Sequence, residues 1–454
     1  MSELRGKRVV VVGLGASGVA AARLCLRRGA RVIATDVQSE GSLSEAARAL
    51  VGEGAELVAG GHGGAMLSTA DRIVVSPGVP PFAELAEAER AGVKIWGEVE
   101  LAVRSLAHPA PVVAIGGTNG KSTTTSLVGA LLQARGLRVF TGGNLGEPLA
   151  DHADETFDVI VLEVSSFQME RVDAFRPRVS VLLNVTPDHL DRYSGVDAYA
   201  DAKGNAFVRQ TSDDVAVIPA GDAVCAKQSA RGRGRIVTFG PGGDVDVLAD
   251  RIVDRARNES FARADFALTG GHNALNVAAS IAAIRSFDVP ADTIRAALRT
   301  FRGLAHRTAL VAEIAGVRYY DDSKGTNVGA VVTALVGLLE PKAVLIAGGR
   351  DKGGSYEPLV RALVEKGRGA VLIGEAADAM ARAIGAAVPV RRARSMEEAV
   401  RIAADLARSG DAVLLSPACS SFDMFRDYKH RGDEFVRAVR ALEPAATVAK
   451  EAAR

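Results

Sequence analysis

The chain has 454 residues, which is the length of about three domains. Its 55 Lys and Arg residues nearly balance 54 Asp and Glu residues, so the net charge of +1 gives no general attraction to nucleic acid or to anionic lipid. No apolar run approaches the ~18 residues that span a bilayer, and three scattered cysteines argue against a disulfide framework or a zinc site. We therefore expect a soluble, cytoplasmic protein.

A glycine-rich turn follows the first predicted strand. The strand is predicted over residues 7–12, Gly13-Leu-Gly-Ala-Ser-Gly18 comes next, and a second strand over residues 31–35 ends at Asp36. This is a dinucleotide fingerprint, in which glycine N–H groups and a helix start hold a diphosphate and the acid, about 20 residues on, reaches a ribose hydroxyl. By itself the fingerprint does not identify the ligand as NAD.

A third strand of this first region, residues 71–75, ends in a loop over residues 76–81. Ligands of parallel sheets bind at such carboxyl ends, although Ser-Pro-Gly is also an ordinary turn sequence. The first domain is expected to span residues 1–105.

The second glycine-rich turn carries the strongest signal in the chain. A strand over residues 112–115 breaks into Gly116-Gly-Thr-Asn-Gly120, and a helix starts at Lys121-Ser122. Glycine N–H groups and the helix N-terminus suit a polyphosphate, Lys121 neutralises the terminal phosphates, and the Ser122 hydroxyl suits Mg²⁺. The generic pattern has glycine where Ile115 stands, so this loop is shorter. We expect ATP to bind here rather than a ligand-free turn.

Two further residues of the second region, Glu163 and His189, are candidates for a metal site. Glu163 follows a predicted strand over residues 158–162, and His189 follows another over residues 180–184. A carboxylate beside a phosphate loop is placed to hold magnesium. The alternatives are a helix-start acid for Glu163 and a structural role for His189. Lys203, taken alone, reads as a solvated surface lysine.

The rest of the second region carries fewer signals. Residues 213–266 have the pattern of short strands and show no recognisable chemistry. Asn273 stands at a helix start, where capping is favoured over contact with a nucleotide. Arg307 is a candidate phosphate clamp after the end of a domain that we expect over residues 106–303.

The last region, residues 304–454, alternates strands and helices, which predicts a mostly parallel sheet. Polar loops over residues 321–327, 348–353 and 416–423 should converge on one sheet edge. Within them Cys419 lacks a recognisable His-Asn partner set, so a packed thiol is favoured over a nucleophile. The predicted fold class is α/β with three domains.

Several motifs together resemble the Mur ligase family, the ATP-dependent amide-forming enzymes that build the peptide of peptidoglycan. The family motifs, in order and spacing, are Gly117-Thr-Asn-Gly-Lys-Ser-Thr-Thr-Thr125, Glu163-Val-Ser-Ser-Phe-Gln168, residues 184–192, Gly271-His-Asn-Ala-Leu-Asn276 and His306-Arg307. Residues 322–327, 348–353 and 415–425 resemble the branch that adds D-glutamate to UDP-N-acetylmuramoyl-L-alanine. An Asp-Asn-Pro-Arg motif, which the diaminopimelate-adding branch carries, is absent from the sequence.

The resemblance implies a fold, a reaction and a set of ligands. The fold would be a Rossmann-like N-terminal domain, a central P-loop ATPase-like domain and a C-terminal Rossmann-like domain that closes on the centre when ligands bind. The reaction would activate the alanyl carboxylate as an acyl phosphate, which the D-glutamate amine then attacks. ATP, two Mg²⁺ ions and a monomeric enzyme in cytoplasmic peptidoglycan precursor synthesis are expected.

The resemblance also implies roles for individual residues. The UDP substrate would contact Gly15, Ala16, Ser17, Asp36, Ser76 and Gly78, with Asn144 on the carboxylate side of the γ-phosphate. The nucleotide would contact Gly117, Thr118, Asn119, Gly120, Lys121, Ser122, Thr123, Asn273, Arg307, Asp322 and Lys324. Magnesium would be held by Ser122 and Glu163, with a second ion on His189 supported by a carbamylated Lys203. D-Glutamate would contact Thr326, Lys352, Ser421, Phe422 and Tyr428, of which Tyr428 is often phenylalanine in the family.

Three alternatives remain open from the residues alone. A folylpolyglutamate synthetase shares the central loop but lacks the first glycine-turn domain, so residues 1–105 discriminate. An NAD-dependent dehydrogenase would use the Gly13–Gly18 turn but leaves Gly-Lys-Ser unexplained. A non-catalytic UDP-sugar-binding module would not need Lys121, Glu163 and His189 together.

Overall fold

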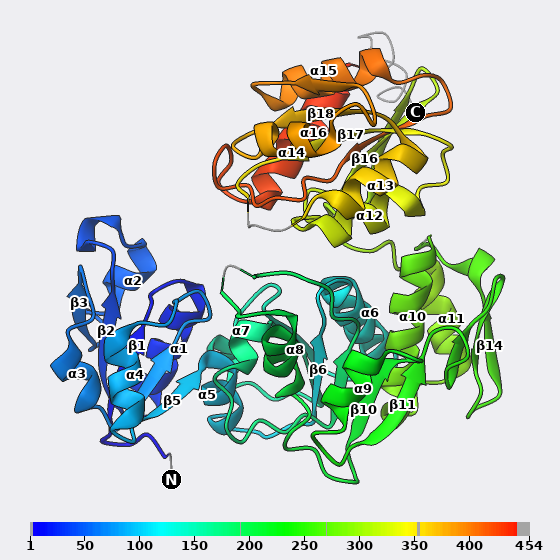
Figure 1. Cartoon of the computed structure of the whole chain (residues 1–454). Coiled ribbons are helices and arrows are strands. Elements are labelled where there is room, and N and C mark those ends of the chain that lie inside the picture. Colours follow the sequence, from blue (N-terminus) through cyan, green and yellow to red (C-terminus); the bar gives the residue numbers. More distant parts are fainter. Residues whose placement is uncertain (1–2, 191, 269, 352–354, 443–454) are drawn as a thin grey trace, which may run out of the picture. The chain divides into compact units, whose positions relative to one another are not determined.

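The computed structural model describes residues 3–190, 192–268, 270–351 and 355–442. It divides into two compact units, each described here by itself (Figure 1). The first unit comprises Met1–Val185, Asp197–Ala267 and Leu275–Phe301, and the second comprises Thr186–Val196, Leu268–Ala274 and Arg302–Arg454. No helix in the described ranges combines the length and apolar character needed to cross a membrane.

The N-terminal part of the first unit is a five-stranded sheet in the order β3-β2-β1-β4-β5, and every pair in it is parallel. Its strands are β1 (Arg8–Val12), β2 (Arg31–Asp36), β3 (Glu56–Ala59), β4 (Arg72–Val75) and β5 (Lys94–Gly97). The Val-rich centre of β1 is fully buried, as expected for a strand covered on both faces. The strand order reverses between β1 and β4, and a ligand crevice is expected at that point.

The central part of the first unit is a nine-stranded sheet in the order β14-β13-β12-β11-β10-β9-β6-β8-β7. Strands β6 to β11 pair in parallel, whereas β12, β13 and β14 form an antiparallel extension at one edge. The strands are β6 (Val112–Gly116), β7 (Val139–Gly143), β8 (Val159–Glu163), β9 (Val179–Leu182), β10 (Val215–Pro219), β11 (Arg235–Phe239), β12 (Val245–Val247), β13 (Arg251–Asp254) and β14 (Glu259–Ala262). The short strands predicted over residues 213–266 are thus present.

Fifteen described helices, most of them short, begin in or border the first unit. They are α1 (Ala16–Arg27), η1 (Glu40–Ser42), α2 (Glu45–Ala49), α3 (Gly64–Ser68), α4 (Ala83–Arg90), α5 (Glu98–Arg104), α6 (Lys121–Ala134), η2 (Leu149–His152), α7 (Ser166–Met169), α8 (Val196–Gly204), α9 (Ala223–Ser229), η3 (Arg263–Asp265), α10 (Gly271–Ile284), η4 (Arg285–Phe287) and α11 (Ala291–Thr300).

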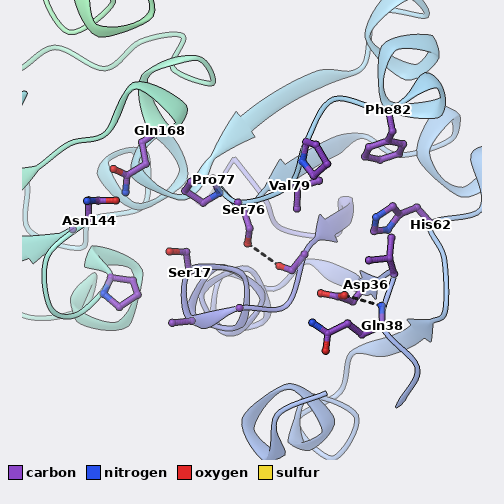
Figure 2. A pocket seen from close by; sticks show the side chains of 18 of the residues that line it. Ser17, Asp36, Gln38, His62, Ser76, Pro77, Val79, Phe82, Asn144 and Gln168 are labelled. Carbon is purple, nitrogen blue, oxygen red and sulfur yellow. Dashed lines mark hydrogen bonds between the residues drawn. The ribbon is translucent and has the colours of Figure 1, made fainter. Parts of the chain in front are cut away.

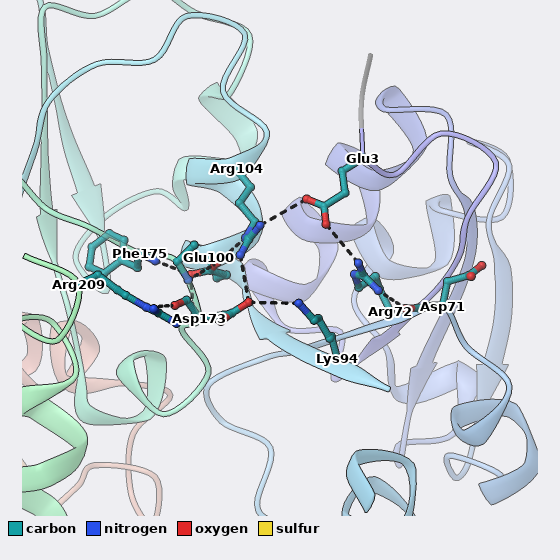
Figure 3. A network of polar contacts seen from close by, with 10 residues as sticks. Glu3, Asp71, Arg72, Lys94, Glu100, Arg104, Asp173, Phe175 and Arg209 are labelled. Atoms are coloured by element: carbon teal, nitrogen blue, oxygen red, sulfur yellow. Dashed lines mark hydrogen bonds and ion pairs between the residues drawn. The ribbon is translucent and has the colours of Figure 1, made fainter. Parts of the chain in front are cut away.

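One continuous hydrophobic core joins the N-terminal and central sheets. It contains Val9 and Trp96 of the first sheet together with Ala114 and Leu162 of the second. A polar network lies beside it (Figure 3), in which Arg104 contacts the carboxylates of Glu3, Glu100 and Asp173. The two sheets of this unit are therefore held together by apolar packing as well as by ion pairs.

Glu100 makes the most specific link in that network. Its buried carboxylate accepts hydrogen bonds from the backbone N–H groups of Asp173, Ala174 and Phe175 at 2.9–3.0 Å. Three aligned donors compensate the loss of hydration of a buried carboxylate. The loop before β9 is thereby fixed to α5 of the N-terminal part.

The second unit is built on a six-stranded sheet in the order β15-β16-β20-β17-β18-β19, in which only the β15–β16 pair is antiparallel. Apolar clusters cover the two faces of this sheet. The predicted α/β class with three sheet-containing regions is confirmed. The elements are β15 (Ala309–Ile314), β16 (Val317–Asp321), α12 (Val328–Gly337), β17 (Ala343–Gly348), α13 (Glu357–Lys366), β18 (Gly367–Ile373), α14 (Ala377–Ile384), β19 (Val390–Arg392), α15 (Met396–Leu406), β20 (Ala412–Leu415) and α16 (Tyr428–Arg440).

Candidate active site

The phosphate loop lies between β6 and α6 at the middle of the central sheet. Gly117 and Gly120 have φ angles of +143° and +83°, which L side chains rarely adopt. A Cβ added at Gly120 would lie 2.4 Å from Oδ1 of Asn276. The loop backbone therefore requires glycine at this position, and the N-terminus of α6 follows directly.

Side chains from neighbouring elements hold the loop in place. The N–H of Thr118 donates to the Asn184 carbonyl at 3.0 Å, and the N–H of Asn119 donates to Asn184 Oδ1 at 2.9 Å. Lys121 Nζ donates to the Thr118 carbonyl at 2.8 Å. The strand predicted to reach Asn184 ends at Leu182, and Asn184 instead braces the phosphate loop. Sequence reasoning quoted Asn184 and Asn276 in motifs but missed this role.

Glu163 ends β8, which runs next to β6 with Glu163 in register with Ile115. Its side chain is 2% exposed, and Oε1 accepts a hydrogen bond from Asn144 Nδ2 at 2.6 Å. Ser122, also 2% exposed, stands in the first turn of α6. Carboxylate and hydroxyl oxygens are the ligands that Mg²⁺ prefers, so these residues fit that ion.

Lys203 is buried on α8, with 5% of the residue exposed. Its Nζ donates to the Gly117 carbonyl at 2.9 Å and lies 4.4 Å from the centre of the Tyr199 ring. The alternative of a solvated surface lysine is wrong, because α8 packs this face against the phosphate loop. The side chain reaches the backbone of the loop itself.

The glycine turn of the N-terminal sheet opens onto a cavity of about 810 Å³ (Figure 2). All seven residues predicted for the UDP substrate line it. They are Gly15, Ala16, Ser17, Asp36, Ser76, Gly78 and Asn144. Asn144 comes from the central sheet, so the cavity lies between the N-terminal and central parts of one unit. Through Asn144 it is hydrogen-bonded to Glu163 beside the phosphate loop.

Two polar side chains of the cavity also shape the turn. Asp36 accepts hydrogen bonds from the N–H groups of Leu14 at 2.7 Å and Gln38 at 3.0 Å. Ser76 Oγ donates to the Gly13 carbonyl at 2.7 Å. Both residues are buried. Their first role is therefore to fix the backbone that surrounds the cavity.

Sequence reasoning missed several lining residues, among them Gln38, His62, Phe82 and Gln168. His62 and Phe82 stack with ring centres 4.8 Å apart, and burial lowers the pKa of His62. Neither residue belongs to a recognisable motif. Only their positions after sheet strands could have drawn attention to them.

In the second unit, Asp322 follows β16 and is buried. Its carboxylate accepts hydrogen bonds from Ser416 Oγ at 2.6 Å and from the N–H of Thr308 at 3.2 Å. Burial raises the pKa of Asp322 to about 7 against the opposing effects of Ser416 and the nearby positive charge of Arg307. Asp322 and Arg307, both predicted nucleotide contacts, are thus close enough to interact.

Asn273 lies inside α10, two residues after its first residue Gly271. The preference for an N-cap role is wrong, because Asn273 is the third residue of the helix and not the residue before it. The neighbouring His272 is mostly buried, and its pKa is lowered by burial and by Arg307. Asn273, His272 and Arg307 all belong to the second unit.

Of the residues predicted for D-glutamate, Thr326, Ser421 and Phe422 lie in loops of the second unit, and Tyr428 is the first residue of α16. Lys324 Nζ lies 3.8 Å from the ring centre of Tyr428, Ser421 is buried and Phe422 is 65% exposed. The N–H of Thr326 donates to the Lys324 carbonyl at 2.8 Å. Lys352 lies outside the described residues. Cys419 is a buried thiol 3.7 Å from the Tyr356 hydroxyl, in agreement with a packed role.

His189 lies in the segment Thr186–Val196 of the second unit, whereas Glu163 and Ser122 belong to the first. His189 has a φ of +55°, and its N–H donates to Asp188 Oδ1 at 3.0 Å. Among the described residues no group of three or more His, Cys, Asp or Glu side chains is placed to hold a metal.

Comparison with known proteins gives matches along most of the chain. Residues 7–97 match the Mur ligase MurD-like N-terminal domain, residues 115–284 match the Mur ligase middle domain, and residues 306–419 match the Mur ligase glutamate ligase domain. Among solved structures, UDP-N-acetylmuramate-alanine ligase from Thermotoga maritima is similar in fold, with a TM-score of 0.60, 18% identity and coverage of 96% of this chain and 100% of that chain. A Mycobacterium tuberculosis folylpolyglutamate synthase, with a TM-score of 0.59 and 16% identity, covers 74% of this chain and 91% of its own.

Curated relatives are much closer in sequence. A UDP-N-acetylmuramoylalanine–D-glutamate ligase from Geobacter metallireducens is 47% identical and aligns with 97% of this chain and 98% of its own length. The enzyme of the same name from Anaeromyxobacter dehalogenans is 45% identical, over 96% of this chain and 98% of its own length. With its three domain matches and these full-length relatives, the chain belongs to the Mur ligase family, in the group of the UDP-N-acetylmuramoylalanine–D-glutamate ligases.

Proposed function

We propose that this chain joins D-glutamate to UDP-N-acetylmuramoyl-L-alanine, with cleavage of ATP to ADP and inorganic phosphate, in the synthesis of peptidoglycan precursors. The observation that carries the proposal is the hydrogen bond between Asn144 and Glu163. It joins the cavity of the N-terminal glycine turn to the phosphate loop, so a substrate held at one is presented to a nucleotide held at the other. The relatives bear the name of this reaction.

The first step addresses the poor reactivity of a carboxylate. The alanyl carboxylate attacks the γ-phosphorus of ATP, and the bond from that phosphorus to the β–γ bridging oxygen breaks. ADP is the leaving group, and the product is an acyl phosphate. Phosphoryl transfer between two anions is mainly a matter of positioning and charge. Lys121 would neutralise phosphate charge, and Asn144 would hold the carboxylate side of the γ-phosphate. The N–H groups of residues 117–123 would hold the remaining phosphate oxygens.

Magnesium fits the oxygen ligands Ser122 and Glu163, with a second ion proposed on His189. When bound, such ions supply charge stabilisation for the transferred phosphoryl group. Glu163 is already oriented for this by its bond to Asn144 and by its place at the end of β8.

In the second step the D-glutamate amine attacks the acyl carbon and the amide bond forms. The bond between the acyl carbon and the phosphate oxygen breaks, and inorganic phosphate leaves with that oxygen. The amine loses a proton in the process. Thr326, Lys352, Ser421, Phe422 and Tyr428 are proposed to bind D-glutamate. Lys352 and the hydroxyl groups suit its two carboxylates. Asn273, Arg307, Asp322 and Lys324 are proposed to hold the nucleotide.

We also propose that Lys203 is carbamylated in the active enzyme. An ammonium at Lys203 would place a second positive charge near Lys121 at the same loop. In carbamylation the ammonium first loses a proton, and the neutral amine then adds to carbon dioxide with release of a second proton, so the side chain would become an anion. Activity should then fall when dissolved carbon dioxide is removed and return with bicarbonate. Intact enzyme that shows no bicarbonate dependence would contradict the modification.

The proposed reaction is tested by phosphate release from ATP with UDP-N-acetylmuramoyl-L-alanine and one amino acid at a time. We expect D-glutamate to support release, and L-glutamate, L-alanine, L-lysine and diaminopimelate to give background rates. Lys121→Ala is the inactive control. Release that depends on a different amino acid, or on a folate in place of the UDP substrate, would overturn the proposal. The molar mass in solution, from size-exclusion chromatography with light scattering, tests the expectation of a monomer.

A further inference from the structure

The side chain of Asn327 binds the segment that carries His189 to the loop that follows β16. Asn327 Nδ2 donates to Asp188 Oδ2 at 3.2 Å. Asp188 in turn accepts the N–H of His189 on Oδ1 at 3.0 Å. Both the segment Thr186–Val196 and Asn327 belong to the second compact unit, so this chain of contacts lies within one body.

Asn327 has a second, independent task. It is the N-cap residue of α12, and its Oδ1 accepts the N–H of Ala330 at 2.8 Å. One amide therefore uses its oxygen to fix the start of a helix and its nitrogen to hold Asp188. A serine would serve the first purpose nearly as well, whereas only a side chain with an N–H donor in this place serves both.

The backbone conformation at His189 requires a stabilising contact of this kind. Its φ of +55° lies in the left-handed region, which a residue with a Cβ adopts only when its surroundings impose it. The Asp188 side chain is 10% exposed, so its hydrogen bond to Asn327 is largely shielded from solvent. A charge-assisted bond in that environment is worth more than one at the surface.

We propose that Asn327 is a positioning residue for His189. Its amide couples the loop after β16, which carries the proposed D-glutamate contact Thr326, to the loop that presents the imidazole. Correct placement of the amino-acid loop and of His189 would then occur together. The proposal rests on the proposed function for its consequence in catalysis, but the coupling itself is a property of the chain alone.

The test compares two single variants and one exchange. Asn327→Ser keeps the helix cap and removes the amide N–H donor. Asn327→Asp keeps the cap acceptor and places a like charge against Asp188. The double variant Asn327→Asp with Asp188→Asn exchanges donor and acceptor, so the bond can form again in the opposite sense. Ser395→Ala, which removes the N-cap of α15 in the same unit, controls for a general loss of helix capping.

The primary readout is hydrogen–deuterium exchange of a peptide covering residues 184–190, in the ligand-free full-length protein. We expect exchange on the order of tenfold faster in both single variants, because one charge-assisted bond is lost. We expect wild-type exchange in the double variant and in Ser395→Ala. A peptide covering residues 328–337 should be unchanged in Asn327→Ser. Unchanged exchange over residues 184–190 in both single variants would overturn the proposal, as would a double variant no slower than Asn327→Asp.

Kinetics give the second readout. Asn327→Ser should lower kcat on the order of tenfold and raise the Mg²⁺ concentration for half-maximal rate, with the KM for the UDP substrate unchanged. A variant with faster loop exchange but wild-type kcat and Mg²⁺ dependence would overturn the positioning role. Wild-type enzyme that shows no D-glutamate-dependent turnover, while loop exchange still responds to Asn327, would refute the proposed function and leave the coupling standing.

Discussion

The first unit contains two glycine-rich turns that look alike in sequence and differ in what surrounds them. Each follows a buried parallel strand, β1 or β6, and each precedes a helix. Helix α6 begins with Lys121 and Ser122, whereas α1 begins with Ala16 and Ser17 and has no charged residue in its first turn. The first turn opens onto a cavity of about 810 Å³. The second is braced by Asn184 and lies against Asn276.

The difference indicates what each turn does to a phosphate. Backbone N–H groups and a helix start bind a diphosphate without changing its reactivity, which suits a substrate handle. Phosphoryl transfer needs charge neutralisation at the terminal phosphate, which suits Lys121 with a carboxylate such as Glu163 to hold a metal. The lysine, rather than the glycines, separates a binding turn from a catalytic one.

Removing the lysine gives the largest expected effect on this comparison. Lys121→Ala should lower kcat/KM about 10³-fold, equivalent to about 4 kcal/mol of transition-state stabilisation. Binding of the UDP substrate in the absence of ATP, measured by calorimetry, should stay within a factor of two or so. Activity above about a tenth of wild type would show that the two turns do not divide the work in this way.

The glycines should differ in effect within one turn. A Cβ at Gly18 would lie 1.8 Å from the Gly13 carbonyl oxygen, whereas a Cβ at Gly15 would have no atom within 4 Å. Gly18→Ala should therefore lower the free energy of unfolding by about 3 kcal/mol or more, and Gly15→Ala by less than about 1 kcal/mol. Urea denaturation measures both. Equal losses would mean that the turn rearranges to accept either side chain.

Much of this arrangement could be predicted from sequence because it depends on local patterns. Alternating apolar runs and glycine turns gave the α/β class, and Lys121, Ser122 and Glu163 follow from strand-end positions beside a phosphate loop. The predicted residues of the UDP pocket all line one cavity for the same reason: parallel strands place their carboxyl ends at one edge.

What could not be predicted depends on contacts between distant segments. Asn184 braces the phosphate loop from 65 residues away, and Asn276 accepts a hydrogen bond from Thr124 of α6 from 152 residues away. No short-range pattern specifies such contacts. From the sequence, Lys203 is interpreted as a surface residue, because tertiary structure determines which face of α8 lies against the phosphate loop. The capping role expected for Asn273 is wrong for a similar reason, since α10 already includes Gly271, a poor helix former that the surrounding structure accepts.

The shared core beneath the two turns is sensitive to pH at Glu98. This α5 residue is 1% exposed, and Oε1 accepts the N–H of Ala150, close to Pro148 of the cavity wall. Burial raises the pKa of Glu98 to about 7 from 4.5, with Ala150 opposing and Asp151 adding to the shift. The protonated form is favoured in the folded state, so this contribution to stability is complete below about pH 4.5 and is lost as pH rises through about 7.

Glu98→Gln tests this contribution. Between pH 5 and 8 the free energy of unfolding of the wild type should fall by about 2–3 kcal/mol because of Glu98, and this part of the pH dependence should disappear in the variant. A buried amide and a buried acid differ in absolute stability, so the comparison is between the slopes of stability against pH and not between values at one pH. Parallel curves for the two proteins, from urea denaturation at each pH, would refute the assignment.

The smallest expected effect is that of removing the Ser76 hydroxyl, which holds the backbone of the first glycine-rich turn. Its hydroxyl donates to the Gly13 carbonyl, so Ser76→Ala should leave a buried acceptor unsatisfied and lower the free energy of unfolding by about 1 kcal/mol. Because the bond shapes the turn that is proposed to hold the UDP substrate, KM for that substrate should rise a few-fold while kcat is unchanged. Ser17→Ala is the matched control, since Ser17 lines the same cavity and should change KM without changing stability. If Ser76→Ala instead weakens substrate binding at unchanged stability, the hydroxyl contacts the ligand directly. The backbone conformation of the first turn would then depend on its glycines and not on Ser76.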